Sequence, residues 1–144
     1  MITILCVDDC SPLQNIICRF LERKGDMEVE TALSTKDALR ILDYISFDVI
    51  VTDYNIKESS GIGLLQQCRQ KGRMTPFIFF TLEQDICMEE DAKRYGRVAF
   101  VPKIRGTCSG FDDLERTIRT LVPASYPGTI TPQKDSFART QGGT

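Results

Sequence analysis

The sequence contains no histidine in its 144 residues. Without an imidazole, the chain has no serine–histidine or cysteine–histidine nucleophile pair and no histidine general base. Metal sites that need a histidine ligand are excluded for the same reason. Any chemistry of this chain must therefore use carboxylates, lysine, hydroxyl groups or thiols.

Long apolar runs and an excess of positive charge are missing as well. No run approaches the ~18 residues of a membrane-spanning helix, and the apolar start of the chain meets Asp8 and Asp9 before a signal-peptide core could form. The formal net charge of −2 leaves no cationic surplus for nucleic-acid phosphates or an anionic membrane surface. We therefore expect a cytoplasmic protein that contacts neither nucleic acids nor membranes directly.

Six cysteines are present, but no two of them form a C-x-x-C pair. They are Cys6, Cys10, Cys18, Cys68, Cys87 and Cys108. In a chain without an export signal, this irregular spacing predicts reduced thiols, most of them small core residues. Cys10 follows the acidic pair directly, which also suits a redox sensor or a ligand of a soft metal, although no second thiol stands at ligand spacing.

Short apolar runs alternate five times with amphipathic stretches along the chain. The predicted strands are residues 2–7, 28–32, 47–53, 76–80 and 97–101, and the predicted helices are residues 11–25, 34–45, 61–71, 83–95 and 110–122. This alternation predicts an α/β fold in which right-handed crossovers build a parallel sheet covered by helices on both faces. The length suits a single domain, which we place at residues 1–122. Residues 123–144 are rich in Pro, Gly, Ser, Thr and Gln without a period, which is typical of a disordered tail or linker.

Local signals predict how several of these elements begin and end. Ser11 and Pro12 predict an N-cap followed by proline at the first helical position. The pattern Ser34-x-x-Asp37 predicts a capping box for the second helix. Pro102, at the end of the fifth predicted strand, suits an edge strand because its missing N–H can face solvent there.

Polar side chains follow four of the five predicted strands at their carboxyl ends. These residues are Asp8, Asp9, Asp53, Thr81 and Lys103. Because the carboxyl ends of parallel strands meet at one edge of the sheet, we expect all five side chains to lie close together. Neighbouring carboxylates repel one another unless a cation lies among them, and Mg²⁺ prefers such oxygen ligands. The sequence therefore predicts a magnesium site with an open position for a phosphoryl oxygen.

This set of residues resembles the receiver domain of two-component response regulators. The resemblance covers residues 1–122 and rests on the order and spacing of the five polar residues, each in its strand context. It implies a single flavodoxin-like (βα)5 three-layer sandwich with the parallel strand order 2-1-3-4-5. It also implies a phosphorylated regulator rather than an enzyme, with at most self-directed phosphotransfer and dephosphorylation.

The resemblance assigns the reacting centre to Asp53. This carboxylate would take a phosphoryl group from the phosphohistidine of a sensor histidine kinase or a phosphotransfer protein and form an acyl phosphate. The positions that match the family's Mg²⁺ ligands are Asp8, Asp9, Asp53 and the backbone carbonyl of Asn55. Since the chain has no histidine, it cannot itself be the kinase.

Two further polar residues and one aromatic residue complete the implied machinery. Lys103 matches the lysine that pairs with the acceptor carboxylate and then with a phosphoryl oxygen, and Thr81 matches the hydroxyl that donates to another such oxygen. Thr81 is also a candidate N-cap for the helix predicted to begin at Glu83. Phe100 occupies the place of the family's switch aromatic, which moves inward together with the hydroxyl residue. Phosphorylation would then change a surface on the fourth helix, fifth strand and fifth helix, where a downstream protein, or a second copy in a homodimer, would dock.

Two residues beside the reacting centre depart from the family pattern. Ile104 follows Lys103 where the family usually has proline after a cis peptide bond, so we expect a trans bond at this position. Leu82 follows Thr81 where the family favours a small residue. The bulk of Leu82 predicts restricted access to Asp53 and slow phosphotransfer.

Two other functions are compatible with these residues. A degenerate receiver would bind its partners without phosphorylation, and the departures at Leu82 and Ile104 favour that alternative. A Mg²⁺-dependent phosphohydrolase with an aspartyl nucleophile would use similar chemistry. Enzymes of that class carry a D-x-D motif on the first strand, whereas Asp8 and Asp9 are contiguous. Phosphorylation of Asp53 and hydrolysis of a small phosphate ester separate these alternatives.

Overall fold

A computed structural model describes residues 1–56, 59–82, 86–103 and 109–122. The elements, in chain order, are β1 (Ile2–Val7), α1 (Ser11–Glu22), β2 (Met27–Ala32), α2 (Thr35–Leu42), β3 (Val49–Thr52), β4 (Asn55–Ile56), β5 (Ser59–Ser60), α3 (Gly61–Gln70), β6 (Phe77–Thr81), α4 (Ile86–Lys93), β7 (Val98–Pro102) and α5 (Ser109–Leu121). The five predicted strands and five predicted helices are all present, with shifts at their ends.

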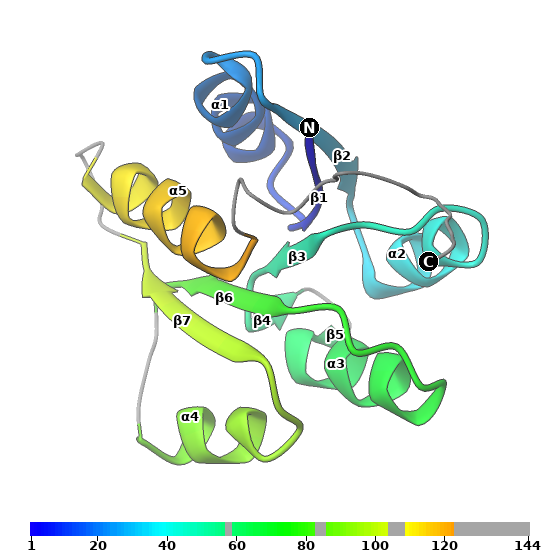
Figure 1. Cartoon of the computed structure of the whole chain (residues 1–144). Coiled ribbons are helices and arrows are strands. Elements are labelled where there is room, and N and C mark those ends of the chain that lie inside the picture. Colours follow the sequence, from blue (N-terminus) through cyan, green and yellow to red (C-terminus); the bar gives the residue numbers. More distant parts are fainter. Residues whose placement is uncertain (57–58, 83–85, 104–108, 123–144) are drawn as a thin grey trace.

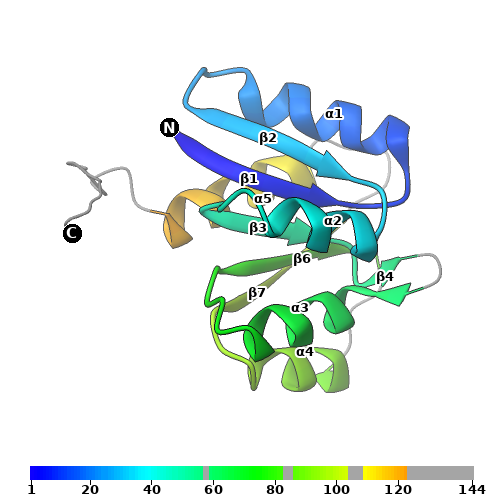
Figure 2. The same ribbon diagram turned by 90° about the vertical axis from the view of Figure 1, so that its right-hand side faces the viewer.

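The main sheet has five strands in the order β2-β1-β3-β6-β7, and all neighbouring pairs are parallel. This is the predicted order 2-1-3-4-5, and it leaves β2 and β7 at the two edges. A short antiparallel hairpin, β4–β5, stands apart from the sheet in the connection between β3 and α3 (Figure 2). None of the five predicted strands covers these residues, so the hairpin is an addition to the predicted fold.

Helices cover both faces of the sheet and produce three layers, with α1 and α5 on one face and α2, α3 and α4 on the other (Figure 1). Successive strand residues point to opposite faces. In β1, Ile4 and Cys6 belong to the core under α1 and α5, whereas Leu5 and Val7 belong to the core on the opposite face. The central strands are therefore buried on both faces, which explains their unbroken apolar runs. None of the helices that the structure describes is long and apolar enough to cross a membrane.

Helix starts follow the predictions only in part. The Ser34 side chain accepts a hydrogen bond from the Asp37 N–H, as predicted for α2. The predicted cap at Ser11 is wrong: Ser11 is already helical, Cys10 occupies the N-cap position, and its side chain makes no capping bond. Instead, Asp8 Oδ1 accepts a hydrogen bond from the Cys10 N–H at 3.0 Å, which orients the turn into α1 from the preceding strand.

Other expectations fall on segments outside the described residues. These are the start of the fourth helix at Glu83 with its cap by Thr81, the peptide bond before Ile104, Cys108, and the tail at 123–144.

Gly61, the first residue of α3, lies against the backbone of Asp53. Its N–H donates to Tyr54 O at 2.8 Å, which brings the start of the helix close to the end of β3. A Cβ at this position would overlap the Asp53 backbone oxygen and lie 2.8 Å from Cε1 of Phe79. Close packing therefore requires a glycine here. The contact fixes the position of the Asp53 backbone at the end of β3.

Replacing Gly61 by alanine should lower the free energy of unfolding by about 1–3 kcal/mol, because the added methyl group forces the helix away from Asp53. Gly63→Ala is the matched control, since its Cβ would meet only the Ser60 Oγ, at an ordinary 3.5 Å. That control should be neutral or stabilise the protein by up to about 1 kcal/mol through helix propensity. Urea denaturation followed by circular dichroism measures both. Equal stability of the two variants would contradict the packing argument.

Candidate functional site

The carboxyl ends of the five parallel strands meet at one edge of the sheet, on the right in Figure 2. Backbone hydrogen bonds fix the residues that follow the strands. The Asp53 N–H donates to Val7 O at 3.1 Å, and the Lys103 N–H donates to Thr81 O at 2.9 Å. The first bond holds the end of β3 beside β1, and the second holds the residue after β7 beside β6.

Lys103 joins two of the predicted carboxylates. Its Nζ donates to Asp8 Oδ2 and to Asp53 Oδ2, each at 2.9 Å. The side chains are 12% exposed for Lys103, 6% for Asp8 and 18% for Asp53, so the contact is largely withdrawn from water. Burial lowers the pKa of Lys103, but the hydrogen bonds with Asp8 and Asp53 outweigh it and raise the pKa above its ordinary value. The two carboxylates therefore favour the protonated lysine, which lies as a cation between them.

The remaining carboxylate oxygens are also engaged. Asp8 Oδ1 accepts from the Cys10 N–H at 3.0 Å, and Asp53 Oδ1 accepts from the Asn55 N–H at 3.2 Å. Each carboxylate is thus oriented by a lysine on one oxygen and a backbone amide on the other. Asp53 is the more exposed of the two, which makes it the carboxylate that an external reactant reaches first.

The other predicted metal ligands, Asp9 and Asn55, lie at the same edge and are exposed. Within the described ranges, no group of three or more aspartate, glutamate or cysteine side chains is close enough together to hold a metal ion. The chemistry of the donors nevertheless fits Mg²⁺, because Asp8 and Asp53 present carboxylate oxygens around a single cation. One ammonium against two carboxylates leaves Asp8, Asp53 and Lys103 with a net charge of −1.

Thr81 is buried at the end of β6, and it lies opposite Pro102 of β7 in the sheet. Phe80, just before it, places its ring 5.9 Å from Lys103 Nζ, so apolar and cationic groups meet beside the site. Leu82, just after it, is 49% exposed. The predicted restriction of access by Leu82 stays a prediction.

Phe100 lies in an aromatic cluster on the α3–α4 side of the sheet. Its ring stacks on Phe79 at 5.1 Å between centroids and lies 6.4 Å from Tyr54, which itself contacts Phe79 at 5.3 Å. Tyr54 follows Asp53 directly, so the cluster begins one residue from the candidate acceptor. Tyr54 and Gly61 are not among the site residues predicted from the sequence. The aromatic residue next to the key carboxylate was the available signal for Tyr54.

Comparison with known proteins supports one family. The model of the response regulator receiver domain matches residues 4–107. The chain is 35% identical over 82 residues to the chemotaxis protein CheY of Pseudomonas aeruginosa, covering 56% of this chain and 66% of that protein. It is 27% identical over 112 residues to the transcriptional regulatory protein TrcR of Mycobacterium tuberculosis, covering 78% of this chain and 38% of that protein. The chain thus spans less than two thirds of the length of either relative.

Solved structures agree with the fold. The chemotaxis protein CheY4 of Vibrio cholerae is 25% identical, with a TM-score of 0.75 over 85% of this chain and 99% of that one. A response regulator receiver domain from Clostridium thermocellum is 29% identical, with a TM-score of 0.71 over 85% of this chain and 94% of that one. TrrA from Thermotoga maritima, solved in complex with Mg²⁺–BeF, is 23% identical with a TM-score of 0.72, over 85% of this chain and 100% of that one.

Sheet order, strand-end residues and sequence matches lead to the same assignment. The chain belongs to the response regulator receiver domain family, whose members act in two-component signalling.

Proposed function

We propose that Asp53 is the phosphoacceptor of this receiver domain. Receiver domains are generally regulators rather than enzymes, and they interact with histidine kinases or phosphotransfer proteins and with downstream targets. The observation that carries the proposal is the Lys103 ammonium, 2.9 Å from both Asp8 and Asp53, with Asp53 the more exposed carboxylate. A cation fixed beside the accessible carboxylate is what phosphoryl transfer to that carboxylate needs.

In the transfer step, a carboxylate oxygen of Asp53 attacks phosphorus and the P–N bond to the partner's phosphohistidine breaks. The electron pair of that bond returns to the imidazole, and the product on this chain is an aspartyl phosphate. Lys103 is placed to keep a hydrogen bond to the reacting centre as negative charge builds on the phosphoryl oxygens. Thr81, fixed beside Lys103 by the backbone bond between them, would donate its hydroxyl to another phosphoryl oxygen.

Mg²⁺ is the cofactor that this site would use, since the receiver family generally binds it. The residues that would hold it are Asp8, Asp9, Asp53 and the backbone carbonyl of Asn55. When bound, the ion would neutralise charge on the carboxylates and on the phosphoryl oxygens. Lys103 already holds Asp8 and Asp53, so these carboxylates must share their oxygens between the lysine and the ion.

The response would pass to a docking surface on α4, β7 and α5, with Thr81 and Phe100 as the switch residues. Phe100 is half-buried and rests on Phe79, so its ring has room to move without opening the core beneath. Ile86, at the start of α4, is 73% exposed. This apolar side chain is available for contact with a protein partner, or with a second copy of the chain.

Incubation with acetyl phosphate and Mg²⁺ should add about 80 Da, the mass of one phosphoryl group, to the protein. Asp53→Asn should abolish the gain, because an amide does not act as the nucleophile. Asp91→Asn, which removes an exposed carboxylate on α4, should leave it unchanged. Intact-mass spectrometry measures all three. Absence of the gain in the folded wild-type protein would favour a phosphorylation-independent receiver, and turnover of a small phosphate ester would favour a phosphohydrolase.

Lys103→Met should bind Mg²⁺ about tenfold more tightly, a change of roughly 1.4 kcal/mol, because the ammonium no longer competes for Asp8 and Asp53. The same variant should lose phosphorylation and be less stable without Mg²⁺, since two neighbouring carboxylates remain uncompensated. Adding Mg²⁺ should therefore raise its Tm more than that of the wild type.

The control is Lys71→Met, which replaces an exposed lysine at the other end of the strands. Calorimetric titration showing equal or weaker Mg²⁺ binding by Lys103→Met would contradict the shared-ligand argument.

Leu82→Ala should accelerate phosphorylation by acetyl phosphate several-fold, because a smaller residue after Thr81 widens the approach to Asp53. Ile45→Ala is a matched control, since both side chains are 49% exposed and Ile45 lies away from the carboxyl edge. Mass spectra taken over time give the rates. An unchanged rate for Leu82→Ala would show that this residue does not restrict access.

A further inference from the structure

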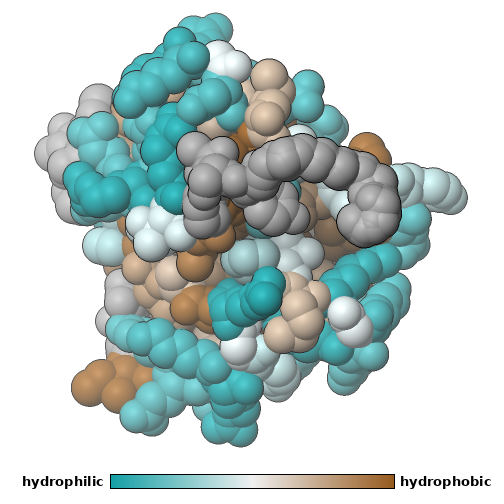
Figure 3. Space-filling model, in the orientation of Figure 1, coloured by the Kyte–Doolittle hydropathy of each residue, from teal (hydrophilic) through white to brown (hydrophobic). Residues whose placement is uncertain are grey.

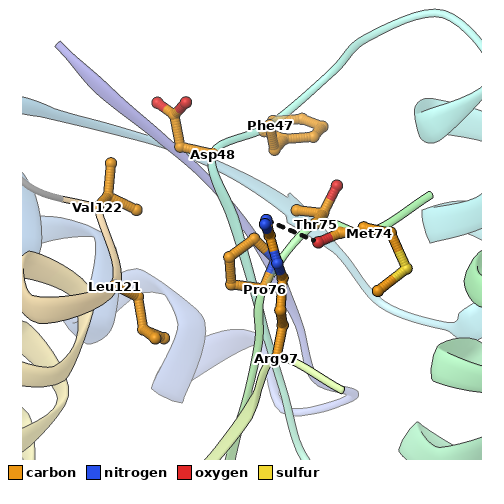
Figure 4. A pocket seen from close by; sticks show the side chains of 8 residues that line it. All are labelled: Phe47, Asp48, Met74, Thr75, Pro76, Arg97, Leu121 and Val122. Atoms are coloured by element: carbon orange, nitrogen blue, oxygen red, sulfur yellow. Dashed lines mark hydrogen bonds between the residues drawn. The ribbon is translucent and has the colours of Figure 1, made fainter. Parts of the chain in front are cut away.

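The edge of the sheet opposite to Asp53, where the strands begin, contains a separate cavity of about 280 Å³ (Figure 4). Its lining residues are Phe47, Asp48, Met74, Thr75, Pro76, Arg97, Leu121 and Val122. We call this cavity the amino-edge pocket. It lies between the end of α5, the segments that lead into β3 and β6, and the turn before β7, and no residue of the proposed phosphorylation site takes part in it.

Apolar and polar side chains both line the amino-edge pocket. Phe47, Pro76, Leu121 and Val122 supply aromatic and aliphatic surface, and Met74 is exposed at its margin. Figure 3 looks onto the starts of the strands and shows apolar side chains interspersed with hydrophilic ones on this face. A hollow that combines aliphatic and aromatic surface with a charged side chain suits a segment of another protein that carries both kinds of group.

Arg97 is held across this pocket by an unusual backbone conformation. It has a φ of +56°, in the left-handed region that side-chain-bearing residues rarely adopt, and it follows Gly96 at +81°. Its carbonyl accepts from the Phe77 N–H at 2.9 Å, which ties the turn to the start of β6. Figure 4 shows the side chain reaching along Pro76 to Met74, whose carbonyl lies 3.5 Å from Arg97 Nη1.

The guanidinium of Arg97 has no ion-pair partner among the described residues. Asp48 lines the same pocket, but its Oδ2 accepts from the Thr3 N–H at 2.9 Å and from Thr3 Oγ1 at 3.2 Å. Figure 4 shows this carboxylate turned away from Arg97. The pocket therefore offers a cation beside an apolar wall, with its own carboxylate engaged elsewhere.

Charge on the neighbouring surface points the same way. Arg73, directly before Met74, contacts Asp43 at 3.2 Å, and Lys71 lies 3.9 Å from the same carboxylate. The cations of Arg97, Arg73 and Lys71 thus outnumber the carboxylates of Asp43 and Asp48 in this region, although the net charge of the whole chain is negative. A complementary ligand carries negative charge next to an apolar group.

We propose that the amino-edge pocket binds an acidic, hydrophobic segment of a partner protein, with an apolar side chain in the pocket and a carboxylate paired to Arg97. The residues that follow Val122 are poorly suited to this role, because 123–144 contain one aspartate against one lysine and one arginine. The proposed contact uses the opposite end of the strands from Asp53. It therefore gives the domain a second interaction surface, which shares only the end of α5 at Leu121 with the α4–β7–α5 surface.

The test titrates the full chain, labelled with ¹⁵N, with an acetylated and amidated peptide of sequence DLFED, beside its charge-reversed counterpart KLFKK. We expect amide shifts centred on Met74, Arg97 and Val122 with the acidic peptide only. Arg97→Asn should weaken binding about fivefold, in line with an exposed ion pair, and asparagine tolerates the left-handed backbone. Arg97→Lys should retain most of the affinity, and Arg116→Asn, an exposed arginine of α5, should retain all of it.

Four outcomes would overturn the proposal. Three are equal binding of KLFKK, unchanged affinity in Arg97→Asn, and shifts confined to α4 or α5 away from the pocket. The fourth is a rise in the molecular mass of the free chain with concentration, accompanied by protection of the pocket amides, because it would assign the pocket to a second copy. Asp53→Asn should bind the peptide as the wild type does, so failure of the phosphorylation proposal and failure of this one can be told apart.

Discussion

The contact of Lys103 with Asp8 and Asp53 is the interaction on which the carboxyl edge depends. These residues follow three different strands, and they meet only if β1, β3 and β7 end at the same level in one parallel sheet. Removing the lysine would leave two mostly buried carboxylates without their cation, at a cost of about 3–5 kcal/mol. Because the lysine ammonium is itself the cation between the carboxylates, both carboxylates are held in place before any metal or phosphoryl donor arrives.

The rest of the fold keeps this contact rigid. Two apolar cores, one on each side of the sheet, hold the strands from both faces. Close packing at Gly61 fixes the backbone of Asp53, and the amide of Asn55 fixes its carboxylate. The aromatic cluster that begins at Tyr54 starts beside this rigid point and reaches Phe100 through Phe79. A change at Asp53 therefore has a packed neighbour to act on, which is what a switch between two arrangements requires.

The sequence was sufficient for the architecture because periodicity and strand-end chemistry are local signals. Unbroken apolar runs marked the central strands, and the polar residues after them marked the functional edge. The features that escaped prediction depend on contacts between distant segments. Cys10 rather than Ser11 precedes α1 because Asp8 binds the Cys10 amide, and the positive φ of Arg97 reflects its tie to Phe77. Neither follows from a residue's own preference. The hairpin β4–β5 has two-residue strands, too short to leave a period.

The two edge strands carry a further consequence for behaviour at high concentration. An open strand edge is a template on which other chains can add and grow into aggregates. Here β2 places two exposed glutamates, Glu28 and Glu30, along one edge, and β7 ends in Pro102, which has no N–H to offer. Like charges on one side and a missing donor on the other oppose open-ended strand addition. Both edges of the sheet are thus protected against the growth of strand-paired aggregates, which favours a dispersed protein at high concentration.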